Sequence, residues 1–249
     1  MNFLLVNDDG IESEGLHALA NALATVGNVY VSAPATQQSG KSISISLMDS
    51  IRVNEYQVPN AVKAWRVDGT PADCTKVGIQ KCAEEGAKID VVFSGINRGS
   101  NLGCDTLYSG TVGAAIEAAL HDRHAVAVSV NNHDAKHFDT ACDLALQVID
   151  YVMKLPVNIV VNINTPDLPP EEILGIKIAT LGQTNYVDEF VCKEDDIYVL
   201  EGYIPDYSHV PDFIDIGANC KGYATVTPIQ FDLTAHDYIE HVSEWNLKI

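Results

Sequence analysis

The first two thirds of the chain alternate short apolar runs with segments whose apolar residues recur at helical spacing. Near-continuous apolar runs are typical of strands covered on both faces, and they lie at residues 3–7, 28–34, 89–95, 125–130 and 158–163. Helical spacing predicts helices from Leu16 to Leu23 and over residues 71–85, 111–122 and 139–154. This alternation predicts an α/β protein, with a Rossmann-like, doubly wound and mostly parallel sheet that has helices on both faces.

Two regions break the alternation. Residues 42–47 (SISISL) alternate strictly like a strand, and residues 51–58 and 62–67 resemble two strands that flank a turn. We therefore expect a β-hairpin excursion off the sheet at about residues 42–68. Strand-like runs at 197–204 and 223–231 predict a β-rich C-terminal appendage. The expected division is a Rossmann-like core at 1–180 and a C-terminal β-rich segment at 181–249 that packs on the core or on another subunit.

Charge and cysteine usage narrow the function classes. The net charge is −19, from 15 Lys and Arg against 34 Asp and Glu, and the basic residues form no cluster. Binding to a nucleic-acid polymer depends on clustered Lys and Arg, so this partner is excluded. No apolar run has the length of a membrane span, and the first residues lack the pattern of a signal peptide. Because the six cysteines are scattered with no CxxC pair, we expect free thiols in a cytoplasmic protein that has no membrane partner.

Polar residues follow three of the expected strands. Asp8 and Asp9 end the first, Ser39 and its neighbours follow the second, and Asn97 lies at the end of the 89–95 run. In a doubly wound sheet the ligand binds at the carboxyl ends of the strands, so these residues can converge. Their oxygens are hard ligands that suit Mg²⁺ or Mn²⁺. One divalent ion would also relieve the repulsion between Asp8 and Asp9.

Local roles compete with this interpretation. Asp8 and Asp9 can cap the following helix, Asn97 can bond its own backbone, and Ser39 can be a turn residue.

Two phosphate-binding fingerprints are absent. Residues 35–42 (ATQQSGKS) depart from GxxxxGKS at Ala35 and run into a strand-like segment, and the first turn has no GxGxxG triad.

A second polar motif precedes the helix expected at 111–122. Backbone N–H groups at the start of a helix, with its positive end, form an anion site. Ser109 and Thr111 can add hydroxyl donors, or cap the helix. The candidate phosphate-binding residues are Ser39, Gly40, Asn97, Gly99, Ser109, Gly110 and Thr111. Three aromatic residues can stack a base or only pack, namely Tyr108, Tyr186 and Trp65.

Five motifs in register resemble the SurE family: NDDG (7–10), QQSGKS (37–42), GTPADC (69–74), SGINRGSNLG (94–103) and YSGTVGAA (108–115). The resemblance continues to residue 234 and is weakest between about 180 and 220. It implies one divalent ion per subunit, with ligands at Asp8, Asp9, Ser39 and Asn97. It also implies homodimers or homotetramers, built partly through exchanged C-terminal segments. The small departures, Ala118 and Ala224-Thr225, do not involve these ligands.

The expected reaction is hydrolysis of nucleoside 5′- (and 3′-) monophosphates to nucleoside and phosphate, with short-chain polyphosphate as a further substrate. The expected catalytic residues are Asp8, Asp9 and Asn97. Either carboxylate can accept a proton from the attacking water, and Asn97 can stabilise charge on the transferred group. A rival mechanism forms an aspartyl-phosphate on Asp8. The alternative function is a non-catalytic module that senses nucleotide or phosphate on the same fold.

Overall fold

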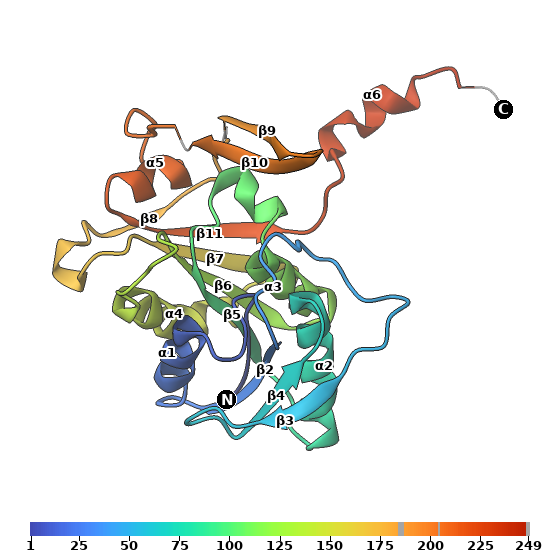
Figure 1. Ribbon diagram of the computed structural model, residues 1–249, viewed down its shortest axis with the longest axis vertical. Helices are drawn as coiled ribbons and strands as arrows, with labels where there is room; N and C mark the ends of the chain where they lie inside the picture. The colour runs from blue at the N-terminus through green and yellow to red at the C-terminus, as the bar shows by residue number, and fades with distance from the viewer. Residues whose placement is uncertain (184–186, 204, 248–249) are drawn as a thin grey trace.

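The computed structural model describes residues 1–183, 187–203 and 205–247 (Figure 1). A nine-stranded sheet forms its centre, in the order β3-β4-β2-β1-β5-β6-β7-β11-β8. Its strands are β1 (Asn2–Val6), β2 (Asn28–Pro34), β3 (Val53–Tyr56), β4 (Lys63–Val67), β5 (Val91–Arg98), β6 (His124–Val130), β7 (Ile159–Thr165), β8 (Ile176–Ile178) and β11 (Ala224–Gln230). The helices are α1 (Glu14–Leu23), α2 (Pro71–Glu84), α3 (Gly110–Leu120), α4 (Asp139–Val152), α5 (Asp215–Cys220) and α6 (Ile239–Ser243), with short 3₁₀ turns η1 (Gly103–Leu107), η2 (Pro170–Glu172) and η3 (His236–Tyr238).

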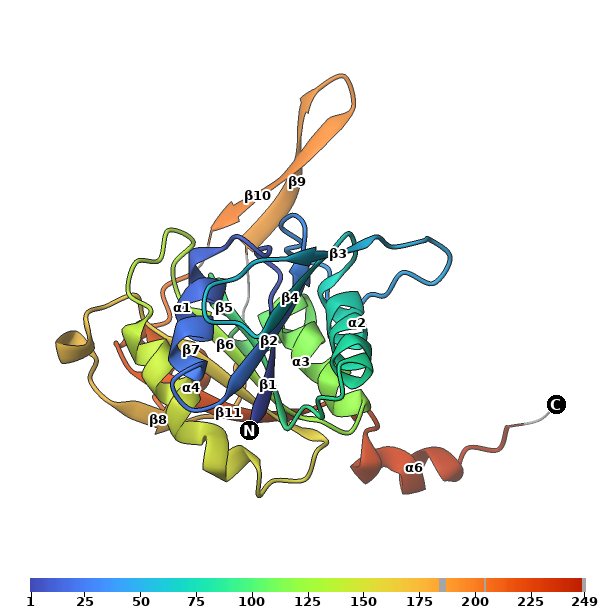
Figure 2. The same ribbon diagram turned by 90° about the horizontal axis from the view of Figure 1, so that it is seen from below.

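The expected doubly wound sheet is confirmed. The six strands β4-β2-β1-β5-β6-β7 all run parallel, and the chain order reverses between β1 and β5. Helices α1 and α4 cover one face and α2 and α3 the other (Figure 2). Because both faces are covered, strands such as β1 are apolar almost throughout, and Phe3, Leu4 and Leu5 are fully buried. Each such side chain contributes about 1.5–3 kcal/mol by leaving water.

The region expected to leave the sheet instead forms its edge. The two predicted strands exist as β3 and β4, but β4 pairs in parallel with β2 and β3 pairs antiparallel with β4. The prediction of a strand at 42–47 is wrong, because these residues form turns and irregular backbone and belong to neither sheet that the structure describes. Its serines are bonded elsewhere. The Ser46 hydroxyl donates to Asp73 (2.7 Å), and the Ser42 hydroxyl donates to the main-chain oxygen of Leu107 (2.7 Å).

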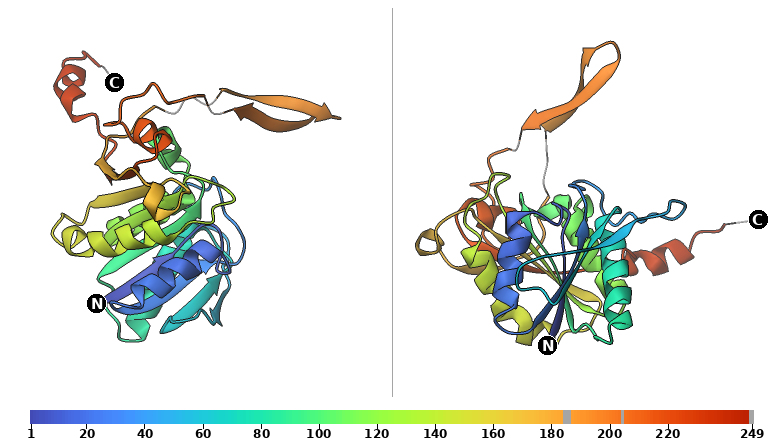
Figure 3. Two further views of the ribbon diagram at one scale, coloured as in Figure 1. Left: turned by 90° about the vertical axis from the view of Figure 1, so that its left-hand side faces the viewer. Right: turned by 60° about the horizontal axis from the view of Figure 1, so that its bottom comes forward.

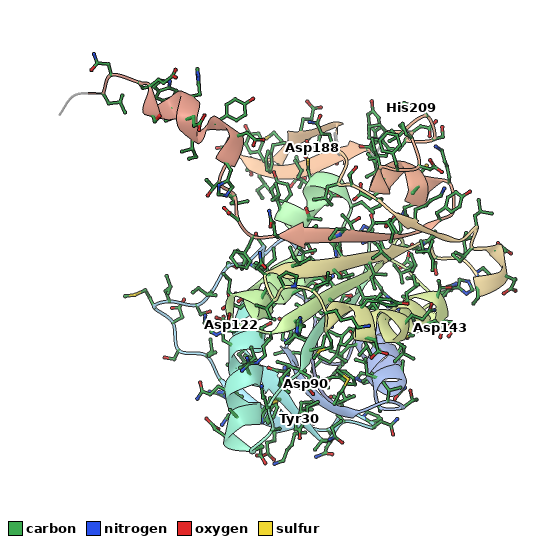
Figure 4. All side chains as sticks on the ribbon, turned by 180° about the vertical axis from the view of Figure 1, so that it is seen from behind. Tyr30, Asp90, Asp122, Asp143, Asp188 and His209 are labelled. Carbon is green, nitrogen blue, oxygen red and sulfur yellow. The ribbon has the colours of Figure 1, made fainter. Side chains whose placement is uncertain are left out.

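The C-terminal part contributes to two different structures. Strands β9 (Val187–Glu194) and β10 (Ile197–Tyr203) form a separate antiparallel hairpin that extends from the body on the side opposite the N-terminus (Figures 2 and 3). Strand β11, by contrast, joins the central sheet antiparallel to β7. Residues beyond 180 therefore complete the sheet, and the expected domain boundary stays a prediction. Figure 4 labels Asp188 of this hairpin near the top of the molecule, far from Tyr30 of β2.

Two further observations concern the whole described chain. None of its helices is long and apolar enough to cross a membrane. All six cysteines carry free thiols, and two of them, Cys74 and Cys82, are buried.

Candidate active site

A polar cleft of about 280 Å³ lies at the carboxyl ends of the strands. It is lined by Asp8, Ser39, Gly40, Asn97, Arg98, Gly99, Ser100, Asn101, Asp105, Tyr108, Ser109 and His133. The strands on either side of the reversal in chain order, β1 and β5, supply Asp8 and Asn97. The structure therefore brings six of the predicted site residues into one cleft, at the position where doubly wound folds bind ligands.

Asp8 is a buried carboxylate at the end of β1, with 3% of its surface exposed. Its Oδ1 accepts a hydrogen bond from the hydroxyl of Thr111 (2.5 Å). The pKa of Asp8 is raised to about 6, mainly because the carboxyl is buried; the bond from Thr111 lowers the pKa, and the charge of Asp9 raises it. Thr111 is fully buried and does not line the cleft, so its hydroxyl is committed to Asp8.

The amino end of α3 packs directly against Asp8. A Cβ placed on Gly110 would lie 2.9 Å from the Cβ of Asp8 and 3.0 Å from its Oδ2. Only glycine allows this approach, because real Cβ atoms are not found so close to another atom. Ser109 caps the helix, since its Oγ accepts a hydrogen bond from the N–H of Val112 (3.0 Å). Ser109 also lines the cleft, so its hydroxyl can meet a ligand there.

Asp9 connects the three polar loops. Its Oδ2 accepts a hydrogen bond from the backbone N–H of Arg98 (3.0 Å), at the end of β5. Its Oδ1 lies 3.4 Å from Nε2 of Gln37, which also donates to Oγ of Ser39 (3.0 Å). Burial raises the pKa of Asp9, and the Arg98 N–H opposes this shift. Residues from the ends of β1, β2 and β5 are thus joined by single hydrogen bonds.

The interpretation of the two carboxylates as a helix cap is wrong. Helix α1 begins at Glu14 and is capped by Ser13, whose Oγ accepts from the N–H of Leu16 (3.3 Å). The turn between strand and helix is held by Asn7, which donates to the Gly10 carbonyl and to Oγ of Ser13, both at 2.8 Å. The two carboxylates therefore have no part in capping α1. Holding two like charges together costs free energy, and capping does not account for that cost.

Asn97 lies near the end of β5 and is 8% exposed. Its Nδ2 donates to the carbonyl of Gly99 (2.7 Å), which leaves its Oδ1 as the atom that can meet a ligand. Gly99 has φ +111°, and a Cβ there would lie 2.8 Å from Cε1 of His133. His133 belongs to the loop after β6, and its position over Gly99 brings an imidazole into the cleft.

The donor set can be compared with the needs of a cation. In the part of the chain that the structure describes, no group of three or more His, Cys, Asp and Glu lies close enough to hold a metal. A cation in this cleft would depend on two carboxylates together with the neutral oxygens of Ser39 and Asn97. Such a set fits Mg²⁺ or Mn²⁺, which take hard oxygen ligands and keep several waters. A bound cation would also neutralise the negative charge of Asp8, which burial makes costly.

The sequence motifs missed part of the cleft lining. Arg98, Ser100, Asn101 and His133 were not candidates, because their role depends on how the loops meet in space. His133 belongs to the segment HDAKH (133–137), whose spacing is not that of a zinc-protease motif. The three base-stacking candidates lie in different environments. Trp65 is 3% exposed and packs in the core, Tyr108 lines the cleft and is 68% exposed, and Tyr186 lies outside the described residues.

Fold and site together define a doubly wound α/β protein whose ligand cleft combines paired carboxylates with the amino end of a helix. The family model described as "Survival protein SurE" matches residues 3–188. The chain belongs to the SurE family.

Named relatives and a solved structure agree with this membership. The chain is 38% identical to "5′-nucleotidase SurE" of Clostridium botulinum (strain Eklund 17B / Type B), over 98% of this chain and 99% of the relative. It is 36% identical to the protein of the same name from Vibrio campbellii (strain ATCC BAA-1116), over 98% and 94%. The structure also resembles the crystal structure of the SurE protein from Aquifex aeolicus, with a TM-score of 0.85, 32% identity and 98% of each chain covered.

Proposed function

We propose that this protein is a divalent-metal-dependent nucleotidase that hydrolyses nucleoside 5′-monophosphates to nucleoside and phosphate. We extend the proposal to 3′-monophosphates and short-chain polyphosphate. The residues that we assign to the cleft would contact the phosphate, which all of these substrates carry. The buried Asp8, held beside Asp9 at the switch point of the sheet, is the observation that carries the proposal. The names of the relatives support it, since each is called a 5′-nucleotidase.

Four residues would hold one Mg²⁺ or Mn²⁺ ion per subunit: Asp8, Asp9, Ser39 and Asn97. When bound, the ion would supply positive charge that polarises the phosphate and lowers the pKa of the attacking water. Thr111 orients Asp8 by holding its Oδ1, which leaves Oδ2 for a ligand.

The phosphate would bind between two loops. The first turn of α3 offers the hydroxyl of Ser109, the N–H of Gly110 and the positive helix end. The facing loops offer the backbone around Gly40 and Gly99, both of which line the cleft. These groups would stabilise charge that develops on the transferred phosphoryl group, and Asn97 would add to them.

We assign proton transfer from the attacking water to Asp8. A general base must lie within hydrogen-bond reach of the proton that it accepts. Asp8 lines the cleft, whereas the oxygens of Asp9 already face Arg98 and Gln37. Attack on phosphorus by Asp8 itself ranks lower, because a carboxylate that holds the cation is a poorer nucleophile, whereas its oxygen still has a lone pair that can accept a proton.

We further propose a homodimer or homotetramer in the cytoplasm. The β9–β10 hairpin exposes apolar residues on its surface, with Phe190 68% and Leu200 52% exposed. The C-terminal helix α6 has no buried residue, and both Ile239 of this helix and Trp245 after its end are exposed. Apolar surfaces of this kind mark contacts with other chains. Free thiols are typical of a reducing compartment.

Phosphate release from a panel of substrates tests the function. The panel contains 5′- and 3′-mononucleotides and tripolyphosphate, each assayed with Mg²⁺, with Mn²⁺ and with EDTA. We expect release from 5′-mononucleotides that EDTA abolishes and added metal restores. Binding of mononucleotides without release, under either metal, would contradict the enzyme and favour a sensing module. Release from tripolyphosphate alone would contradict the nucleotidase and favour a polyphosphatase.

A further inference from the structure

The loop that follows Asn97 and the end of β5 is anchored through Asn101, which is 5% exposed. The backbone N–H of Asn101 donates to Oδ1 of Asn164 (2.7 Å), and its carbonyl accepts from Nδ2 of the same side chain (3.1 Å). Nδ2 of Asn162 donates to that carbonyl as well (2.9 Å). The side chain of Asn101 in turn donates to Oγ of Ser129 (2.7 Å). Every one of these contacts is buried.

The position of these amides in the fold is unusual. Asn162 and Asn164 lie two residues apart on β7, so they share one face of this strand, whose first three residues are apolar. Both are essentially inaccessible to solvent, at 0% and 1% exposed. Burying an amide costs free energy unless it is hydrogen-bonded. The Asn164 side chain is bonded through both its oxygen and its nitrogen, so hydrogen bonds to Asn101 offset this cost, whereas Asn162 is bonded through Nδ2 and its buried Oδ1 has no partner among the described residues.

A second contact fixes the same loop two residues further on. The N–H of Gly103 donates to Oδ2 of Asp215 (2.7 Å), a fully buried carboxylate at the start of α5. Asn219 of α5 also approaches the main-chain oxygen of Asn164 (3.4 Å) and accepts from Nδ2 of Asn131 (2.7 Å). The loop is therefore held from β6, β7 and α5, none of which supplies a predicted metal ligand.

We propose that Asn164 is a positioning residue for the cleft. By pairing with both backbone groups of Asn101, it sets where Asn97 and Gly99 stand relative to Asp8. The inference rests on the proposed function, because it concerns the cation and phosphate that these residues would bind. Its chemistry is specific to an amide. An aspartate has no donor for the Asn101 carbonyl, and a serine is too short to bridge both groups.

The test compares Asn164→Ser and Asn164→Asp with a matched control, Thr225→Val. Thr225 is fully buried on β11, and its hydroxyl approaches the main-chain oxygen of Asn164 (3.4 Å) without touching Asn101. Three quantities are measured for each purified full-length protein: the Kd for Mn²⁺ by calorimetry, kcat and KM for a 5′-mononucleotide, and the urea midpoint of unfolding. The two Asn164 variants remove the pairing in different ways, so one remains informative if the other does not fold.

We expect the Asn164 variants to bind Mn²⁺ about 10-fold more weakly, as loss of a contact that orients a ligand does. At saturating Mn²⁺ we expect kcat to fall about 100-fold, the cost of misplacing reacting groups by about 1 Å. Thr225→Val should keep the wild-type Kd and kcat even if its urea midpoint falls. A folded Asn164 variant with wild-type Kd and kcat would overturn the positioning role while leaving the function intact. A wild-type protein without Mn²⁺ binding or turnover would overturn both.

Discussion

Replacing Asp8 by Asn should make the metal-free protein more stable while removing its activity. The cause is the burial of Asp8, which raises its pKa from the usual value of 3.8 to about 6. Below pH about 4 the carboxyl is protonated in both the folded and the unfolded chain, so it contributes no difference. As the pH rises from about 4 to about 6, the unfolded chain releases the proton that the folded protein retains, and stability falls.

The size of the effect follows from the shift. A difference of about 2 pKa units, at about 1.4 kcal/mol each, corresponds to about 3 kcal/mol of lost stability above pH 6. Asparagine removes the charge, but its NH₂ group fits poorly against the backbone N–H of Thr111, which costs about 1 kcal/mol. The net gain is about 2 kcal/mol, or about 4–8 °C in Tm for a chain of this size.

Thermal unfolding at pH 8 in EDTA measures this gain, and a series down to pH 4 measures its pH dependence. The advantage of Asp8→Asn should shrink as the pH falls, because the wild-type carboxyl becomes protonated. Saturating Mn²⁺ should reverse the order. An ion at 100 times its Kd stabilises the wild type by about 2.7 kcal/mol, and it should not stabilise the variant.

Asp167→Asn provides a control for which we expect the opposite change in stability. Burial raises the pKa of Asp167, but bonds from the N–H groups of Lys136 (2.9 Å) and His137 (2.8 Å) lower it overall. Its ionised form stabilises the fold above the unfolded pKa, so Asn should destabilise the protein at pH 8. The reasoning about Asp8 is refuted if Asp8→Asn melts below wild type at pH 8 in EDTA, or if its advantage persists at pH 4.

Three further predictions concern residues around the cleft. Gly110→Ala should lower kcat/KM at least about 10-fold by displacing Asp8, and a wild-type value would contradict the close packing of the two residues. Asp215→Asn should lower the free energy of unfolding by about 2 kcal/mol: burial raises the pKa of Asp215, but both of its oxygens accept backbone N–H groups, so an NH₂ group would face the N–H of Gly103 or those of Gly182 and Ile216. An unchanged urea midpoint would argue against these contacts. Tyr108→Ala should raise KM for mononucleotides about 10-fold through lost base stacking, yet leave KM for tripolyphosphate unchanged. Equal effects on both substrates would exclude stacking.

The strands were predictable because burial on both faces leaves a continuous apolar run in the sequence. Their partners were not. The segment that became β4 reads as a strand in either location, and only the structure shows that it pairs with β2 instead of leaving the sheet. Alternation at 42–47 was misleading for the same reason, since a strand also needs a neighbour with which to pair. The entry of β11 into the sheet likewise depends on the path of the chain after β8.

The cleft was predictable where its residues directly follow strands. Asp8, Asp9 and Asn97 follow or end two strands of a doubly wound sheet, and such folds bind ligands at the carboxyl ends of their strands. The groups that hold them come from far along the chain, and no local pattern marks them. Thr111 is 103 residues from Asp8 in the sequence, and Asn164 is 63 residues from Asn101.

The central claim is that the paired carboxylates hold a divalent cation that hydrolysis requires. The most direct test is phosphate release from a 5′-mononucleotide by EDTA-treated protein as Mn²⁺ is added, for the wild type and for Asp9→Asn. We expect no release without metal, saturable recovery in the wild type, and a loss of about 10²-fold or more in the variant with its fold intact. Turnover that survives EDTA, or that Asp9→Asn leaves unchanged, would contradict the account.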